Sequence, residues 1–355
     1  MKKNRYFLIS VIILAIISLI LILTQSKTTF KHSISDFALD DSSNVTKIFM
    51  SDKNNNTVTL TRLEPGKWKV NDKYPAQKFS VDLLLQTMVD IHVNEPVSKA
   101  AHNNIIKRMA ANSVKVEIYQ RVYRIGLFGF IRWFPHEKLT KVYYVGDATQ
   151  SNLGTFMLMD QSTQPFVTSL PGFRGFISPR FSPFEKYWRD YSVFNKNITE
   201  ISSVRVEVPS APELSYLVEN TGDNKFALLS LVDKREIKDY DTLKLLNFLS
   251  GFRSLNFEAL LNDMDSHRKD SILSSTPFIV ITLTDTGGVS KTIRTYRKPG
   301  PIGQTDVNGK PFPYDMDRLY ALVNDGQDFT LIQYYNFDKV LRPKSFFMKQ
   351  SPGKK

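Results

Sequence analysis

Apolar and polar residues alternate along several short stretches of the chain, a pattern typical of half-buried β-strands. The first two such stretches are residues 45–50 and 57–63. Between them lies the polar run at 52–56, whose asparagines tolerate positive φ and favour a hairpin turn. Residues 81–91 instead repeat apolar side chains at helical spacing. Strands and a helix mixed in one stretch predict an α+β fold.

A similar order of elements recurs in the second half of the chain. The matched elements are the helical positions Leu84, Met88 and Ile91 with Leu245, Leu249 and Phe252, the aromatic positions Trp68 and Phe226, and the strands 114–119 and 278–283. Their offsets of 161, 158 and 164 residues are nearly constant. The sequence therefore predicts two tandem mixed β-sheet/helix modules, the first at residues 45–194 and the second at 195–343.

An apolar run of 18 residues, Tyr6–Leu23, follows a basic cluster in the first five residues. As a helix it measures roughly 27 Å, close to the hydrocarbon thickness of a bilayer. The sequence predicts a transmembrane anchor at residues 1–24, in preference to a cleaved signal peptide, whose apolar region is usually shorter. The basic cluster places the N-terminus in the cytoplasm. We therefore expect a single-pass protein of the cytoplasmic (inner) membrane, with a tether at 25–44 and most of the chain in the periplasm.

The amino-acid composition mainly excludes certain classes of protein and site. The 355 residues include no cysteine, which excludes disulfide scaffolds, thiol nucleophiles and Cys-type zinc sites. The net charge of +12 would suit nucleic-acid binding, but much of the excess lies at the two ends, including a basic tail predicted at 344–355. A translocated domain meets no genome, so we expect no nucleic-acid partner.

Searches for catalytic chemistry end without a site. The five histidines form no pair at zinc-ligand spacing, and no Gly-x-Ser-x-Gly turn is present. The run at 286–292 lacks the glycine that a phosphate loop needs before its lysine. Asp285-Thr286-Gly287 resembles an aspartic-protease motif, but it occurs once, so a hairpin turn is the better interpretation. The sequence predicts no catalytic residue, no cofactor and no metal.

Aromatic and basic residues are interleaved between Glu117 and Val145, in a segment that we expect to split two strands. Gly126 and Gly129 favour turns within it. Such a segment can insert into a membrane interface, form a hot spot for a protein partner, or pack between the modules. The candidate contact surface comprises Leu127, Phe128, Phe130, Ile131, Arg132, Trp133 and Phe134.

Several segments carry a resemblance to a known family. They are KWKVNDKYPA at 67–76, NEPV at 94–97, VKVEIYQRVYR at 114–124, YYVGDATQSNLGTFMLM at 143–159, LPGFRGFISPRF at 170–181 and WRDYSVF at 188–194. Together they resemble the bacterial family termed domain of unknown function 4340, in its membrane-anchored form typical of Bacteroidetes. The resemblance covers most of the first module and weakens in the second. It implies an envelope protein whose relatives are encoded near ABC-transporter permease and accessory subunits, and it carries over no catalytic residues.

These observations together predict a function without enzymatic chemistry. We expect a membrane-anchored, extracytoplasmic accessory or scaffolding subunit of a cell-envelope complex, with ABC-transporter permease or accessory subunits as its candidate partners. A protein that binds envelope glycans or lipids is the alternative, and a hydrolase of unfamiliar type is the third interpretation.

Overall fold

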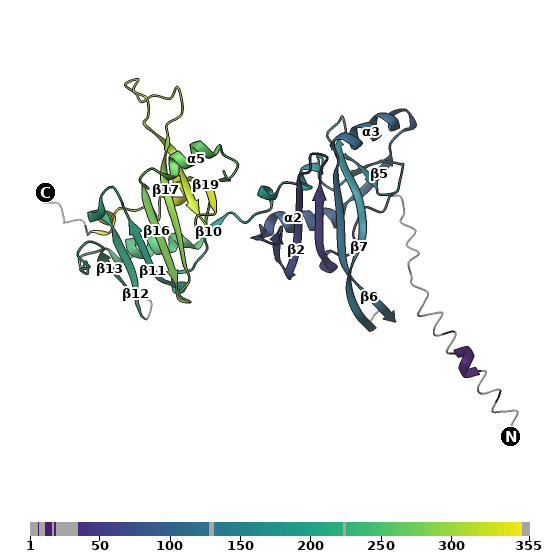
Figure 1. Cartoon of the computed structure of the whole chain (residues 1–355), viewed down its shortest axis with the longest axis horizontal. Helices are drawn as coiled ribbons and strands as arrows, with labels where there is room; N and C mark the ends of the chain where they lie inside the picture. Colours follow the sequence, from purple (N-terminus) through teal and green to yellow (C-terminus); the bar gives the residue numbers. More distant parts are fainter. Residues whose placement is uncertain are drawn as a thin grey trace. The chain divides into compact units, whose positions relative to one another are not determined.

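A computed structural model describes residues 35–127, 131–222 and 225–349, together with Tyr6, 11–15 and 18 near the N-terminus (Figure 1). The side chains of residues 125–127, 131 and 132 are outside this description. The chain forms two compact units, with the boundary between Asp190 and Tyr191. Each unit is a mixed α/β structure in which large antiparallel sheets predominate.

The first unit is built on an antiparallel sheet whose described strands follow the order β4–β3–β2–β1–β6–β7–β8–β9–β5. The strands are β1 (Val45–Ser51), β2 (Thr57–Glu64), β3 (Lys67–Val70), β4 (Tyr74–Pro75), β5 (His92–Pro96), β6 (Val114–Leu127), β7 (Ile131–Ala148), β8 (Thr155–Met159) and β9 (Phe166–Ser169). Short 3₁₀ turns lie at η1 (Ser42–Asn44), η2 (Ser178–Arg180) and η3 (Glu185–Tyr187).

Helices cover both faces of this sheet. Helix α2 (Lys78–Asp90) packs on the face that carries Tyr143, and α3 (Lys99–Asn112) packs on the face that carries Tyr144. Successive residues of a strand point to opposite faces, so the two neighbouring tyrosines of β7 belong to different cores. The larger core lies under α2, where the predicted stripe of Leu84, Met88 and Ile91 is buried.

The second unit repeats this plan with the strand order β13–β12–β11–β16–β17–β18–β19–β15. Its strands are β11 (Ile201–Glu207), β12 (Tyr216–Gly222), β13 (Lys225–Ser230), β15 (Ala259–Leu260), β16 (Ile279–Asp285), β17 (Ser290–Pro299), β18 (Tyr314–Val323) and β19 (Asp328–Gln333), with β10 (Ser192–Phe194) and β14 (Leu255–Asn256) forming a separate pair. The helical segments are α4 (Thr242–Ser250), α5 (Ser266–Leu273), α6 (Tyr334–Phe337), η4 (Ile198–Glu200), η5 (Pro212–Leu214), η6 (Gly251–Arg253) and η7 (Lys344–Phe347). Helix α4 packs on the face of Leu319 and Ala321, and α5 on the face of Tyr320 and Leu322.

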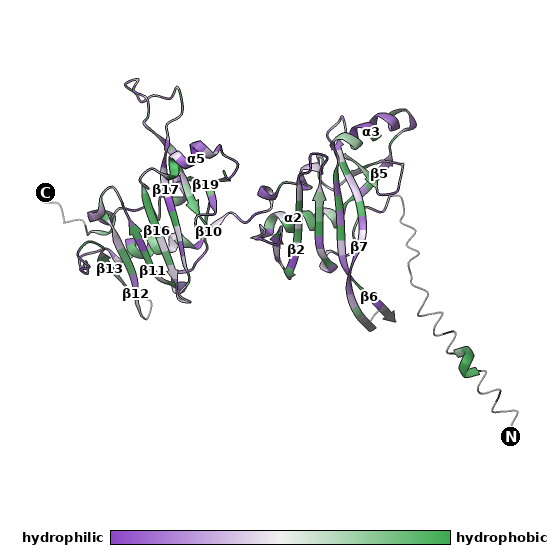
Figure 2. Ribbon diagram, in the orientation of Figure 1, coloured by the Kyte–Doolittle hydropathy of each residue, from purple (hydrophilic) through white to green (hydrophobic). Residues whose placement is uncertain are grey.

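The two sheets agree in strand order and in register. Without β4, the first sheet has the order of the second, strand for strand. β1 pairs with β6, the strand after α3, and β11 pairs in the same way with β16, the strand after α5. Ile48 opposite Ile118 corresponds to Val204 opposite Leu283. Both pairings contain a bulge at the same place, between Val45 and Lys47 and between Ile201 and Ser203. Each unit is therefore a copy of one topology, with its own apolar core (Figure 2).

The structure differs from the sequence-based boundaries at three points. Phe37 and Leu39, which the sequence assigns to the tether at 25–44, are buried in the first core. The division of the chain after Asp190 precedes the predicted one after Phe194. Phe347, assigned to the basic tail at 344–355, is fully buried in the second core. A few apolar side chains on otherwise polar segments are enough to bring those segments into a core.

The predicted transmembrane anchor lies mostly outside the described residues. Among the residues that the structure does describe, no helix combines the length and apolarity needed to cross a bilayer. The described positions within Tyr6–Leu23 are helical, and the side chains of Tyr6 and Val11–Leu14 are exposed. The anchor therefore stays a prediction.

Candidate contact surface on the β6–β7 hairpin

Strands β6 and β7 form a hairpin that continues well past the sheet (Figure 1). They pair from Val114 opposite Val145 to Leu127 opposite Ile131. In the described structure, the pairing of β1 with β6 ends at Gln120, and that of β8 with β7 starts at Tyr143. Residues 121–127 and 131–140 thus form a two-stranded ribbon, here called the arm.

The arm corrects one sequence-based expectation. The segment does not split two strands, because β6 and β7 pair with each other throughout their described length. Gly126, which favoured a turn, lies within β6 opposite Arg132. Gly129 lies outside the described residues. In an elongated hairpin the two strands pair with each other, so the insertion costs the sheet no pairing.

Among its described residues, the second unit has no counterpart of the arm. Asp285 is the register equivalent of Gln120, and β16 ends there. Asp285 Oδ1 accepts hydrogen bonds from the N–H groups of Gly287 (3.0 Å) and Val289 (2.9 Å), so the protease-like tripeptide forms the expected hairpin turn. A hydrogen bond from Lys196, together with those backbone donors, holds the pKa of Asp285 below its usual value. The arm is therefore an addition to the repeated fold.

Two aromatic side chains of the predicted contact surface are exposed on the arm. Trp133 is 61% exposed and Phe134 is 64% exposed. Leu127, Ile131 and Arg132 lie in the strands at the far end of the arm, whereas Phe128 and Phe130 fall outside the described residues. Both aromatic side chains are therefore mostly open to solvent, whereas large aromatic side chains are usually largely buried.

The arm also carries exposed positive charge. Arg121, Arg124 and Lys138 are exposed, and none of the three makes an ion pair with another described residue. The carboxylate nearest to them in the ladder, Glu137, is already engaged by Lys47 at 2.8 Å. Cationic and aromatic side chains therefore share one narrow ribbon.

The root of the arm is fixed to strand β1. Glu137 accepts hydrogen bonds from Lys47 Nζ (2.8 Å) and from Thr46 Oγ1 (2.6 Å). The bond from Lys47 and then that from Thr46 lower the pKa of Glu137, and the same bond raises the pKa of Lys47. Lys47 also lies over the ring of Tyr119, 4.0 Å from its centroid. Glu137 is 91 positions from Thr46 and 90 from Lys47, so no local sequence pattern could have linked them.

The first described segment of the chain meets the arm at this root. Lys141 Nζ contacts the carboxylate of Asp36 at 2.7 Å and donates to its backbone carbonyl at 2.9 Å. Gln120 Nε2 donates to the carbonyl of Asp41 at 3.4 Å. The polypeptide therefore enters the first unit beside the point where the arm leaves the sheet.

Phe134 has an unusual backbone conformation. Its φ is +56°, in the left-handed region that bulky residues rarely adopt. Pro135 follows it, and a residue before proline ordinarily prefers extended geometry. A side chain held there costs of order 1–2 kcal/mol, and such positions cluster at binding sites. The sequence contains no signal for this conformation.

The second unit has an addition of its own, the loop 300–313 between β17 and β18. Ile302 and Val307 on it are fully exposed. The corresponding connection between β7 and β8, residues 149–154, is short. Within the loop, Asp306 accepts the backbone N–H groups of Asn308 and Lys310, in a tight turn that includes Gly309 at φ +76°.

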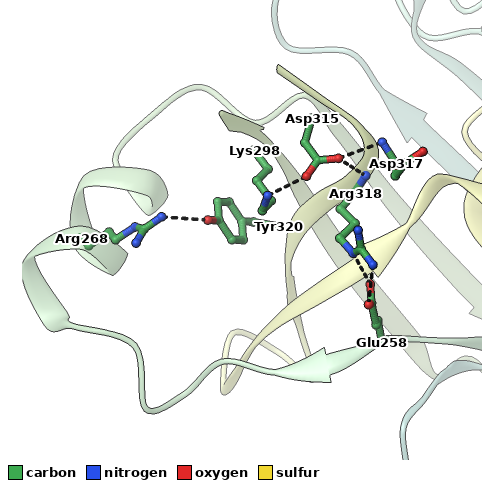
Figure 3. A network of polar contacts seen from close by, with 7 residues as sticks. All are labelled: Glu258, Arg268, Lys298, Asp315, Asp317, Arg318 and Tyr320. Carbon is green, nitrogen blue, oxygen red and sulfur yellow. Dashed lines mark hydrogen bonds and ion pairs between the residues drawn. The ribbon is translucent and has the colours of Figure 1, made fainter. Parts of the chain in front are cut away.

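A polar network fixes the base of this loop (Figure 3). Lys298 Nζ contacts Asp315 Oδ2 at 2.6 Å, and Asp315 Oδ1 accepts the N–H groups of Asp317 and Arg318. Burial alone would raise the pKa of Asp315, but these hydrogen bonds outweigh it and lower the pKa. Arg318 also pairs with Glu258 through two hydrogen bonds of 2.8 and 3.0 Å. The charged groups of this network pair with one another, so the network has a structural role.

Comparison with known proteins adds no relative. No family model, no curated protein and no solved structure matches the chain. Within the described residues, no three acidic or histidine side chains are grouped so that they could hold a metal ion. The candidate site is therefore defined by the geometry of the arm alone.

Proposed function

We propose that the protein is a membrane-tethered accessory or scaffolding subunit of a cell-envelope complex, with a binding role and no catalytic one. Its candidate partners are ABC-transporter permease or accessory subunits, as the family resemblance implies. Binding of envelope glycans or lipids is the alternative function. The duplicated fold supplies two compact units, and in this proposal the arm supplies the surface for contact.

The arm is the observation that carries this proposal. A repeated fold that is complete without it has been extended at one hairpin, and the extension exposes Trp133 and Phe134. Exposed aromatic side chains beside arginine are the residue types that dominate binding hot spots. Exposed aromatic side chains on an element outside the core support a role in contact with another surface.

The N-terminal residues support the tether. The described positions from Val11 to Leu14 are helical, apolar and exposed. An 18-residue apolar run of this kind is stable in a bilayer and costly to expose to water. The tether would keep the two units beside the membrane components of the complex.

Purification from native membranes tests the proposed function. The full-length tagged chain is extracted in a gentle detergent, purified by size exclusion, and analysed by mass spectrometry, with untagged cells as the control. We expect other membrane proteins to co-purify in fixed stoichiometry. If the chain elutes alone under conditions that keep known envelope complexes intact, the accessory-subunit proposal is wrong.

A further inference from the structure

We propose that the arm binds the anionic headgroup surface of the same bilayer that holds the N-terminal anchor. This inference rests on the proposed function, because it requires the tether. It goes further by naming what the arm contacts. In this arrangement the first unit touches the membrane at two points, the anchor and the arm.

The position of the tether brings the arm within reach of the membrane. Residues 24–34 separate the predicted anchor from Ser35, and a chain of that length spans at most roughly 40 Å when fully extended. Strand β7 from Lys141 out to Ile131 measures about 33 Å at the usual rise per residue. The tether and the arm meet the first unit at the same place, because Asp36 contacts Lys141 at the root of the arm. The tether therefore keeps the bilayer surface within roughly 40 Å of the root of the arm, a limit close to the length of the arm itself.

The side chains of the arm match the chemistry of an anionic interface. Trp133 and Phe134 are exposed, and aromatic rings partition to the headgroup region of a bilayer. Arg121, Arg124 and Lys138 are exposed without ion pairs in the described structure, so they are available to lipid phosphates. Each basic residue near an anionic surface favours binding by a factor of roughly five. Glu137, the carboxylate at the root, is neutralised by Lys47 and does not oppose this attraction.

Trp133 can report the contact in the full-length protein. The other two tryptophans, Trp68 and Trp188, are 5% and 3% exposed, so quenchers reach Trp133 preferentially. The full chain is reconstituted in vesicles of phosphatidylcholine alone or mixed with phosphatidylglycerol, with bromine on the lipid acyl chains near the headgroup. We expect bromolipids to quench Trp133 in the anionic vesicles and acrylamide to quench it poorly there. In neutral vesicles we expect the opposite result, with strong quenching of Trp133 by acrylamide and weak quenching by bromolipids.

Three variants separate the contributions. In Trp133→Phe the lipid-dependent quenching disappears, while the emission of the two buried tryptophans stays blue-shifted, which confirms folding. Changing Arg121, Arg124 and Lys138 together to Gln lowers the bilayer-bound fraction of the arm by a factor of the order of 100. The matched control changes the exposed Lys238, Arg253 and Lys310 of the second unit to Gln, removes the same charge, and leaves the quenching unchanged.

The possible failures are distinguishable. Retention of the chain in alkaline carbonate, with Trp133 open to acrylamide and unquenched by bromolipid in both vesicle types, overturns the lipid contact and leaves the tether intact. Shielding of Trp133 only when co-purified proteins are present also overturns it and makes the arm a protein-docking surface, which supports the proposed function. Release of the full chain from the vesicles by carbonate contradicts the proposed tether itself.

Discussion

Lys141 of β7 and Lys291 of β17 are equivalent residues that make the same contact in the two units. Lys141 lies opposite Ile118 and Lys291 opposite Leu283, the same position in the two ladders. Lys141 Nζ donates to the carbonyl of Asp36 at 2.9 Å, and Lys291 Nζ donates to that of Ser192 at 3.3 Å. In each unit, this lysine connects the segment that enters the unit to the root of the equivalent hairpin, β6–β7 in the first unit and β16–β17 in the second.

This relationship predicts that Lys141→Met destabilises the first unit. The substitution keeps the apolar stem but removes both contacts to Asp36, at a cost of about 1–2 kcal/mol in the free energy of unfolding. Chemical denaturation measures the loss, and amide exchange at Phe37 should quicken. Lys138→Met is the matched control, because Lys138 is exposed and makes no ion pair with a described residue. Equal effects of the two substitutions would contradict the assigned role.

Tyr143→Phe is expected to stabilise the first unit. The Tyr143 hydroxyl is fully buried and has no hydrogen-bond partner among the described residues, and burial raises its pKa. Its register equivalent in the second unit is Ile293, an apolar residue at a fully buried position. Removing the hydroxyl should raise the free energy of unfolding by about 1 kcal/mol. Tyr216→Phe should lower the free energy of unfolding of the second unit by a similar amount, because the Tyr216 hydroxyl donates to the carbonyl of Arg342 at 2.9 Å.

At Phe134, glycine should be better tolerated than alanine. Alanine usually suits a strand better than glycine, but the φ of +56° reverses the order, because only glycine adopts it without cost. Relative to Phe134→Ala, Phe134→Gly should stabilise the arm by about 1 kcal/mol. Hydrogen exchange of the arm amides measures the difference. Faster exchange in the glycine variant would show that the backbone at Phe134 is not held in this conformation in solution.

Asp315→Asn is expected to destabilise the second unit by about 2 kcal/mol. The buried carboxylate of Asp315 accepts hydrogen bonds from Lys298 and from the backbone of β18, and the substitution removes the charge that strengthens them. The native pKa of Asp315 is lowered, so its contribution is complete above the ordinary value of 3.8. The contribution is lost as the pH falls through the lowered native pKa. Thermal unfolding between pH 7 and pH 2 should therefore show the wild type approaching the variant only in strong acid. The exposed Asp317 supplies the control Asp317→Asn, which should change little.

Local sequence patterns predicted those helices and strands in which buried side chains recur at a regular spacing. The helix expected at 81–91 is α2, Lys78–Asp90, and its apolar stripe is buried as predicted. The strands expected at 45–50 and 57–63 are β1 and β2, and Asn55 in the connection has φ +62°. Each of these features depends on side chains within a few residues of one another, so the sequence contains the necessary information.

Helix α3 shows where the local pattern fails. Only Ile105 and Met109 of its 14 residues are buried, so its apolar stripe is too narrow to stand out. A capping signal was present, since the Ser98 side chain accepts from the N–H of Ala101. Helix α5, which packs on the corresponding face of the second sheet, has no fully buried residue and gave no apolar pattern either.

The candidate site was predictable in its composition and not in its shape. The mixture of aromatic and basic residues identified the segment, and Trp133 and Phe134 are indeed exposed. The contact itself stays a prediction. The extended hairpin depends on pairing between residues up to 31 positions apart, and its root depends on the pairing of Glu137 with Lys47. Such long-range contacts leave no periodic trace in a single sequence.

The position of the arm at a hairpin end gives the fold a place where its length can vary. Residues added in equal number to both strands beyond Gln120 leave the register of every earlier pair unchanged. The short turn at Asp285 in the second unit and the arm in the first are two lengths of the same connection. Graded lengthening or shortening of this hairpin, two residues at a time, would change the reach of the protein without redesigning its core.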